Sequence, residues 1–150
     1  MARFLLVHGS CHGAWCWRDV IPALGALGHH ADAIDRPSHG TDRTPVGDVT
    51  LDSYRDAILA ACTADTIVVG HSMAGYPIAA AAEHAPDAIA RLVIVCAYVP
   101  GSGLSLAEMR RAAPRQPLLG AIVMSDDRVS FTIDPDQAEQ VFYNDCTPDI

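Results

Sequence analysis

The sequence predicts an α/β fold built on a doubly wound, mostly parallel sheet. Short apolar runs rich in β-branched residues occur at residues 3–7, 66–69 and 91–95, and such runs are typical of buried strands. The segments between them have helical spacing or an alanine-rich composition. Regular alternation of strands and helices indicates crossover connections and hence a parallel sheet.

The elements follow one another in a simple order. Residues 3–7 lead into a glycine-rich turn at 8–13, and residues 17–27 have the spacing of an amphipathic helix that Gly28 ends. The later elements are a strand at 31–34, a loop at 35–48, a helix at 51–62 capped by Thr50 or Asp52, a strand at 66–69, a helix at 73–84 and a strand at 91–95.

The last third of the chain has a different character. The sequence Pro-Gly-Ser-Gly at 100–103 breaks the alternation, and a short helix is expected at 106–111. Two alternating runs at 119–124 and 129–133 predict a β-hairpin, and a helix is expected at 136–143. We therefore expect a core domain at residues 1–100 and a cap excursion at residues 101–150.

Two turns are predicted to meet at one place. In a doubly wound sheet the winding direction reverses once, and ligands bind beyond the carboxyl ends of the strands at that switch point. The predicted strand order is second, first, third, fourth. This order places the turn that contains His8, Gly9 and Ser10 beside the turn that contains His71 and Ser72.

Ser72 has the sequence setting of a nucleophile elbow. It follows an apolar strand, lies between small residues and precedes a predicted helix. Such a turn holds a serine hydroxyl where a base can take its proton. The N–H groups of Ser10 and Met73 would then converge on one oxygen as an oxyanion hole, and we expect His8, Gly9, His12 and His71 to line the substrate pocket.

These motifs resemble those of the α/β-hydrolase superfamily. The segments HGSCHGAWCW at 8–17 and GHSMAG at 70–75 are similar to the branch that contains plant methyl-ester esterases, hydroxynitrile lyases and bacterial relatives. The resemblance implies Ser72 as nucleophile, the backbone of Ser10 and Met73 as oxyanion hole, and a cap over a small pocket. Ala74 stands where the common motif ends in glycine.

The rest of a catalytic triad is missing from the sequence. The family resemblance implies an acid and then a histidine after the nucleophile, yet no histidine follows His84 and residues 96–103 contain no Asp or Glu. The strand at 91–95 is apolar on both faces, as central strands are, but the predicted order leaves it at an edge. We therefore expect a C-terminally truncated hydrolase that is inactive as these 150 residues alone.

Composition excludes several other classes of protein. There are 18 acidic and 10 basic residues, a net charge of −8, which disfavours binding to nucleic acid or to an anionic membrane. We expect a cytoplasmic protein without cofactor, and five cysteines that are reduced and mostly buried. Cys11, His12 and Cys16 lack a second ligand pair for zinc. Gly70 to Gly75 lacks the lysine of a phosphate-binding loop.

Alternative functions stay open at this point. The expected partner is a small-molecule ester, with a homodimer left open. On the same scaffold, relatives cleave cyanohydrins with a hydroxyl at the position of Ser10, so a lyase is the first alternative. The second is a non-catalytic remnant that binds a ligand or a partner through its exposed sheet edge.

Overall fold

The computed structural model describes residues 1–147, and the chain divides into two compact units. The first unit comprises Met1–Leu106, and the second begins at Ala107. Each unit is described by itself below. Within residues 1–147, no helix is long and apolar enough to cross a membrane.

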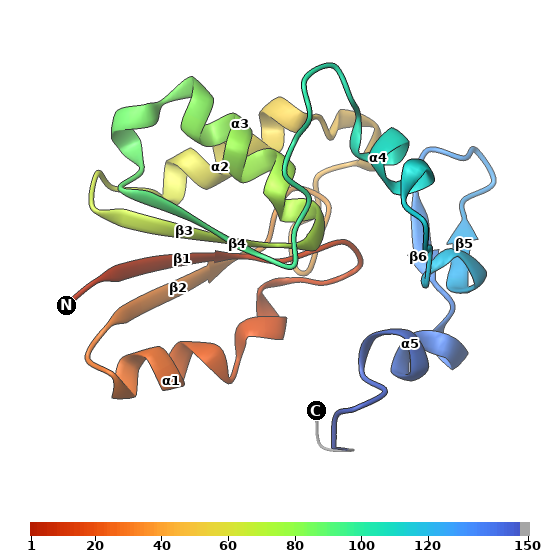
Figure 1. Cartoon of the computed structure of the whole chain (residues 1–150), viewed down its shortest axis with the longest axis horizontal. Helices are drawn as coiled ribbons and strands as arrows, with labels where there is room; N and C mark the ends of the chain where they lie inside the picture. The colour runs from red at the N-terminus through yellow and green to blue at the C-terminus, as the bar shows by residue number, and fades with distance from the viewer. Residues whose placement is uncertain (148–150) are drawn as a thin grey trace. The chain divides into compact units, whose positions relative to one another are not determined.

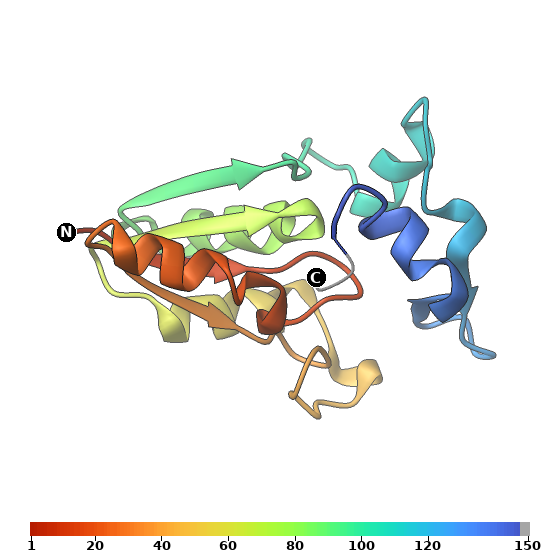
Figure 2. The ribbon, with the colours of Figure 1, turned by 90° about the horizontal axis from the view of Figure 1, so that it is seen from below.

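The first unit is built on a sheet of four parallel strands. The strands are β1 (Arg3–Val7), β2 (His30–Ile34), β3 (Thr66–His71) and β4 (Arg91–Val95), in the order β2-β1-β3-β4 (Figure 1). This is the predicted order, and the predicted bounds of β1 and β4 are confirmed. β2 begins one residue earlier than expected, and β3 continues two residues further, to His71. All four strands run in the same direction, so their carboxyl ends share one edge (Figure 2).

Helices cover both faces of this sheet. α1 (Val20–Ala26) lies on one face, and α2 (Leu51–Ala61) and α3 (Gly75–His84) lie together on the other (Figures 1 and 2). The main core forms between β1, β3 and the α2–α3 pair. Its buried members are Leu5, Val7, Ile58, Val68, Ala74, Ile78, Ala81 and Ile89. The β-branched and aliphatic side chains of the strands thus supply most of the burial that stabilises this unit.

The predicted helix at 17–27 is wrong at both ends. The structure forms a short 3-10 helix at Ala14–Trp17 and then α1, which begins at Val20 and places Pro22 in its first turn, where proline is tolerated. No residue of α1 is buried, and Leu27, the last residue of the predicted helix, is 73% exposed. α1 packs mainly on β2, the strand at one edge of the sheet, so few apolar neighbours are available to cover its side chains.

α2 begins with a capping box. The Thr50 hydroxyl accepts a hydrogen bond from the Ser53 N–H at 3.0 Å, and the Ser53 hydroxyl accepts one from the Thr50 N–H at 2.9 Å. Thr50, one of the two predicted caps, is therefore the N-cap residue, and two otherwise orphaned donors are satisfied. In the preceding loop, Val46–Asp48 forms one 3-10 turn.

β4 lies at the edge of the sheet. Within residues 1–147 it pairs only with β3, and its apolar residues Ile94 and Val95 are 41% and 39% exposed. An apolar strand with an unpaired edge is a site that natural proteins normally cover. The exposure agrees with the expectation that the sequence pattern of this strand suits a more central position.

The second unit contains a hairpin and helices. α4 (Leu106–Ala112) begins at the boundary, β5 (Ile122–Met124) and β6 (Phe131–Ile133) form the antiparallel hairpin, and α5 (Pro135–Phe142) follows. The predicted hairpin is confirmed, but Leu119–Ala121 is a 3-10 turn and not part of the strand. The Asp134 carboxylate accepts a hydrogen bond from the Asp136 N–H and so caps α5, which begins one residue before the predicted position.

The expectation that the cysteines are mostly buried is wrong. All five are free, as expected, but Cys96 and Cys146 are exposed and the other three are half-buried. Cys96 follows β4 and shares the exposure of that edge strand.

Candidate active site

Ser72 lies on a sharp turn between β3 and α3. β3 ends at His71, a single 3-10 turn covers Ser72–Ala74, and α3 follows at once. Ser72 itself has φ of +56°, a left-handed conformation that is uncommon for a residue with a side chain. Such strained residues occur where the surrounding structure imposes them, and they are frequent at active sites. This backbone is the one that the predicted nucleophile elbow requires.

Close packing around the turn explains why its neighbours are small. A Cβ on Gly75 would overlap the backbone carbonyl of Tyr98, and a Cβ on Gly70 would lie 2.6 Å from Cδ1 of Ile78. The Tyr98 N–H also donates a hydrogen bond to the Ser72 carbonyl at 3.0 Å. The segment that follows β4 therefore packs directly against the elbow and holds it in place.

The glycine-rich turn after β1 lies against the elbow, as the strand order predicted. β1 and β3 are neighbours with Val7 opposite Gly70, so the two turns leave the sheet side by side. The Ser10 hydroxyl donates a hydrogen bond to Sδ of Met73 at 3.2 Å. Two segments separated by about 60 residues in the sequence thus form one site.

The two amides predicted as an oxyanion hole are placed at this junction. Among residues 1–147, no acceptor takes a hydrogen bond from the Ser10 N–H. Met73 lies in the first turn of the helical segment, where N–H groups lack partners within the helix. Their shared action on one oxygen stays a prediction.

His8 is placed behind the glycine-rich turn. Its ring is fully buried, and Nδ1 donates a hydrogen bond to the Gly9 carbonyl at 2.7 Å, while the Arg36 backbone N–H donates to Nε2 at 3.4 Å. Burial, together with the neighbouring Arg36 guanidinium, lowers the pKa of His8 to about 3. A neutral imidazole in this position holds the turn from behind and is not placed to contact a ligand.

The other predicted pocket histidines are nearer to the open side of the turns. His12 stacks on Trp15 with ring centroids 5.2 Å apart, and its Nδ1 donates to the Ser10 carbonyl at 2.8 Å. His71 meets the edge of Trp17 at 6.5 Å, and burial, with His12 nearby, lowers the pKa of His71. Both are half-buried, so each retains a surface that a ligand could contact.

Sequence reasoning missed the residues that follow β2. The Asp35 carboxylate accepts hydrogen bonds from the Ala14 N–H at 2.6 Å and from both the N–H and the hydroxyl of Thr41 at 2.9 Å. Although partial burial opposes ionisation, these hydrogen bonds lower the pKa of Asp35. Arg36, beside it, is fully buried. Their position at the carboxyl end of β2, the strand next to β1, was the signal that could have found them.

The described residues do not supply a complete proton relay. Within residues 1–147, no histidine or carboxylate is hydrogen-bonded to the Ser72 hydroxyl. In the same part of the chain, no group of three or more His, Cys, Asp or Glu side chains is arranged to hold a metal ion. What the first unit provides is therefore a half-buried serine on a strained turn, together with backbone donors.

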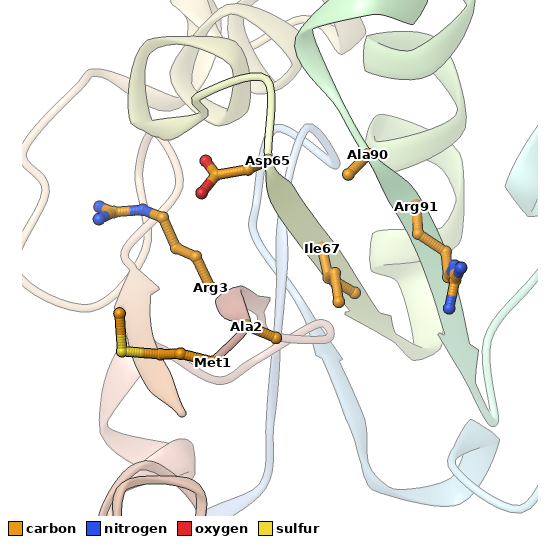
Figure 3. A pocket seen from close by; sticks show the side chains of 7 residues that line it. All are labelled: Met1, Ala2, Arg3, Asp65, Ile67, Ala90 and Arg91. Atoms are coloured by element: carbon orange, nitrogen blue, oxygen red, sulfur yellow. The ribbon is translucent and has the colours of Figure 1, made fainter. Parts of the chain in front are cut away.

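A cavity of about 260 Å³ lies at the opposite end of the sheet. It is lined at the amino-terminal ends of β1, β3 and β4 by Met1, Ala2, Arg3, Asp65, Ile67, Ala90 and Arg91 (Figure 3). Figure 3 shows the side chains of Arg3 and Arg91 pointing to opposite sides, so their charges do not converge on one point. None of the predicted site residues lines it, and ligands of doubly wound sheets bind at the carboxyl ends of the strands.

The comparison with known sequences identifies a family. The family model for "Alpha/beta hydrolase family" matches residues 4–148. Esterase PIR7B from Oryza sativa subsp. japonica is 40% identical over 129 residues, which cover 78% of this chain and 48% of the esterase. Methylesterase 2 from Arabidopsis thaliana is 40% identical over 105 residues, which cover 65% of this chain and 40% of that protein. The chain thus spans about half the length of the curated relatives that it matches.

Solved structures show the same architecture. One is an extracellular alpha/beta-hydrolase from a Paenibacillus species, described as sharing structural and functional homology with tobacco salicylic acid binding protein 2. It aligns with a TM-score of 0.67 and 28% identity, and the alignment covers 75% of this chain and 47% of that protein. The pyrethroid hydrolase PytH aligns with a TM-score of 0.82 and 25% identity over 97% of this chain and 62% of its own. The strand order, the strained serine and these matches lead to one conclusion: the chain belongs to the alpha/beta hydrolase family.

Proposed function

We propose that this chain carries the nucleophile and the oxyanion hole of a serine carboxylesterase that acts on small esters. The observation that carries the proposal is the left-handed backbone of Ser72, at the carboxyl end of β3 and against the turn of Gly9 and Ser10. The esterase names of relatives that are 40% identical support the choice of ester as substrate.

The chemistry follows from the groups at the junction. The Ser72 oxygen would form a bond to the ester carbonyl carbon while its proton passes to a base, and the carbonyl electrons would move onto the oxygen. The N–H groups of Ser10 and Met73 would stabilise that oxyanion. Collapse of the intermediate expels the alcohol with a proton from the base and leaves an acyl-enzyme. Water then repeats the sequence and releases the acid.

The base and its orienting acid are proposed to come from sequence outside these 150 residues. Two observations support this: no base contacts the Ser72 hydroxyl within residues 1–147, and the relatives are about twice as long as this chain. β4, whose unpaired edge is exposed, would be the place where further strands join the sheet. On this proposal, the 150 residues alone hydrolyse esters very slowly.

A second function is favoured by one observation. The Ser10 hydroxyl lies at the elbow, 3.2 Å from Sδ of Met73, where it could contact the hydroxyl of a bound cyanohydrin. A lyase of this kind would break a carbon–carbon bond and release cyanide and a carbonyl compound, without an acyl-enzyme. Ser10→Ala separates the two functions, because it removes the hydroxyl and keeps the backbone N–H.

The test compares the 150-residue chain with a longer product of the same gene, where one is encoded. Hydrolysis of p-nitrophenyl esters and cleavage of a cyanohydrin are measured for both, with Ser72→Ala as the inactive variant. Ser38→Ala is the matched control, because Ser38 is a second serine with a left-handed backbone, at φ of +63°, in the loop after β2. An esterase loses activity in Ser72→Ala and keeps it in Ser38→Ala and Ser10→Ala.

Three outcomes would contradict the proposal. Full ester hydrolysis by the Ser72→Ala variant would remove Ser72 from the mechanism. Cyanohydrin cleavage that is lost in Ser10→Ala, without ester hydrolysis, would establish the lyase. If the longer product does neither reaction, the first unit is a binding module and the proposed activity is wrong.

A further inference from the structure

We propose that Arg36 is a positioning residue for the oxyanion hole. Arg36 holds the Gly9–Ser10 peptide so that the Ser10 N–H faces away from the protein interior. The inference rests on the proposed function for its catalytic meaning. Its geometric content, the orientation of one peptide by a buried guanidinium, is independent of any turnover.

The Gly9 carbonyl is held by two donors. Nη2 of Arg36 donates to the Gly9 oxygen at 3.0 Å, and Nδ1 of His8 donates to the same oxygen at 2.7 Å. The Arg36 backbone N–H also donates to Nε2 of His8 at 3.4 Å, which agrees with a proton on Nδ1 that faces the Gly9 carbonyl, and Nη2 of Arg36 lies 3.3 Å from Nδ1. One residue therefore acts on this carbonyl both directly and through His8.

The geometry of the peptide bond carries this effect to Ser10. In a trans peptide the carbonyl of one residue and the N–H of the next lie in one plane and point in opposite directions. Since the Gly9 carbonyl points toward Arg36, the Ser10 N–H must point away from it. Ser10 also places its hydroxyl against Met73, so this face of the peptide borders the elbow. The Ser10 N–H has no acceptor among residues 1–147 and is free to serve a ligand.

The burial of Arg36 is unusual for a purely structural residue. The side chain is fully buried, and neither Nε nor Nη1 has a hydrogen-bond partner in the part of the chain that the structure describes. The Tyr54 ring, 4.7 Å from the guanidinium carbon, compensates only in part. Burial lowers the pKa of Arg36 to about 10, so it is charged at neutral pH. A buried charge without an ion-pair partner carries a desolvation penalty that its few hydrogen bonds offset only in part.

The positive charge of Arg36 acts on the Gly9–Ser10 peptide. A cation behind the Gly9 carbonyl draws electron density toward that oxygen and makes the Ser10 N–H a stronger donor. Fixed donors of this kind stabilise developing negative charge without reorganisation. Arg36 would thus strengthen and orient the oxyanion hole although it touches neither the substrate nor Ser72.

The test uses a property of the sequence. Glycine precedes serine at only two places in the 150 residues, Gly9–Ser10 and Gly101–Ser102. In protein labelled with carbonyl-13C glycine and 15N serine, an HNCO spectrum therefore contains two correlations. One reports on the proposed peptide, and the other is an internal control. Spectra are compared for the wild type, Arg36→Met, Arg36→Lys and Tyr54→Leu.

The expected result is specific to the Gly9–Ser10 peptide. In Arg36→Met, its carbonyl carbon and its amide proton both shift upfield, because a charged donor to the carbonyl is lost. The Ser102 correlation stays in place, and Arg36→Lys gives a smaller shift. Tyr54→Leu, which removes a contact to the guanidinium but no donor to Gly9, leaves both correlations nearly unchanged. Urea unfolding is expected to show Arg36→Met as stable as the wild type or more so.

Kinetics of the longer gene product form the second arm. Arg36→Met is expected to lower kcat/KM for p-nitrophenyl esters by roughly tenfold or more, with KM little changed, because loss of an oxyanion donor itself lowers kcat by about 10² to 10³. Arg36→Lys is expected to restore part of this activity. An unchanged Gly9–Ser10 correlation in either Arg36 variant would overturn the positioning role. A shift without any esterase activity in the wild type would leave positioning intact and contradict the proposed function instead.

Discussion

Gly9 and Ser72 are in contact across the junction of the two turns. A Cβ on Gly9 would lie 3.0 Å from the Cβ of Ser72 and 3.2 Å from Nδ1 of His71. These distances are tighter than nine in ten real Cβ contacts, so a methyl group here would require its neighbours to move by a few tenths of an ångström. Glycine at position 9, which has no Cβ, therefore permits the close spacing between the proposed oxyanion donors and the proposed nucleophile.

Gly9→Ala is expected to separate the two turns and to lower the reactivity of Ser72. Displacement of a catalytic group by about 1 Å can reduce the rate by about 10², so the smaller shift that a methyl group requires here is expected to have a smaller effect. Overpacking of this size also destabilises by about 1–3 kcal/mol. Ester hydrolysis by the longer gene product and urea unfolding measure the two effects. A Gly9→Ala variant with wild-type kcat/KM would show that the contact does not set the geometry of the site.

Gly75 and Gly25 provide a matched pair for the packing of the elbow. A Cβ on Gly75 would overlap the Tyr98 carbonyl, a backbone atom that cannot rotate away, whereas a Cβ on Gly25 in α1 meets no atom within 4 Å. Gly25→Ala is expected to stabilise the protein by about 0.5–1 kcal/mol, because alanine is the better helix former. Gly75→Ala is expected to destabilise it strongly. Equal unfolding midpoints for the two variants would contradict the packing described here.

His8 is expected to make stability depend on pH. Its pKa in the folded protein is lowered to about 3, while in the unfolded chain it has the ordinary value of 6.5. Between these values the unfolded chain binds more protons, so folding stability falls as pH falls from about 6.5, by at most about 1.4 kcal/mol per pH unit. Urea unfolding from about pH 7 to about pH 4.5 measures this slope.

His8→Gln is the variant that isolates this titration. Glutamine has no proton to gain, and its amide is able to donate to the Gly9 carbonyl, so the slope should be shallower than in the wild type. The same slope in both proteins would show that His8 is not the buried neutral group that the structure indicates.

The exposed edge of β4 is expected to make the isolated 150 residues self-associate. Ile94 is 41% exposed on a strand that, within residues 1–147, has one neighbour only. Ile94→Lys places a charge on this edge and should shift the chain toward monomer in sedimentation velocity. Leu27→Lys is the control, because Leu27 directly follows α1, which packs on β2 and not on β4, and is 73% exposed. Association that responds equally to both substitutions would not arise from β4.

The sequence was sufficient for the architecture of the first unit because its signals are local. β1 and β4 are short apolar runs with clear bounds, and their predicted limits are those observed. The strand order followed from one rule about the switch point. The elbow could be recognised because Gly70 and Gly75 flank Ser72, and the structure shows the contacts that require small residues there.

What the sequence did not show depends on contacts between distant segments. The burial of Arg36 arises from His8, Gly9 and Tyr54, none of which is near it in the sequence. A charged residue after a strand is ordinarily expected at the surface, so composition and periodicity gave no reason to place it inside. The helix α1 was predicted, although with different bounds, but its low burial was not, because the pattern of its apolar residues does not reveal how little of the sheet lies beneath them.

The central claim is that Ser72 is a reactive nucleophile, and covalent labelling tests it most directly. The longer gene product and the 150-residue chain are treated with a fluorophosphonate, digested, and mapped by mass spectrometry, with Ser72→Ala and Ser38→Ala alongside. A single adduct on Ser72 is expected, which forms rapidly in the longer product and far more slowly in the short chain. It should be absent in Ser72→Ala and unchanged in Ser38→Ala. An adduct on another residue, or none on Ser72 in a longer product that hydrolyses esters, would contradict the central claim.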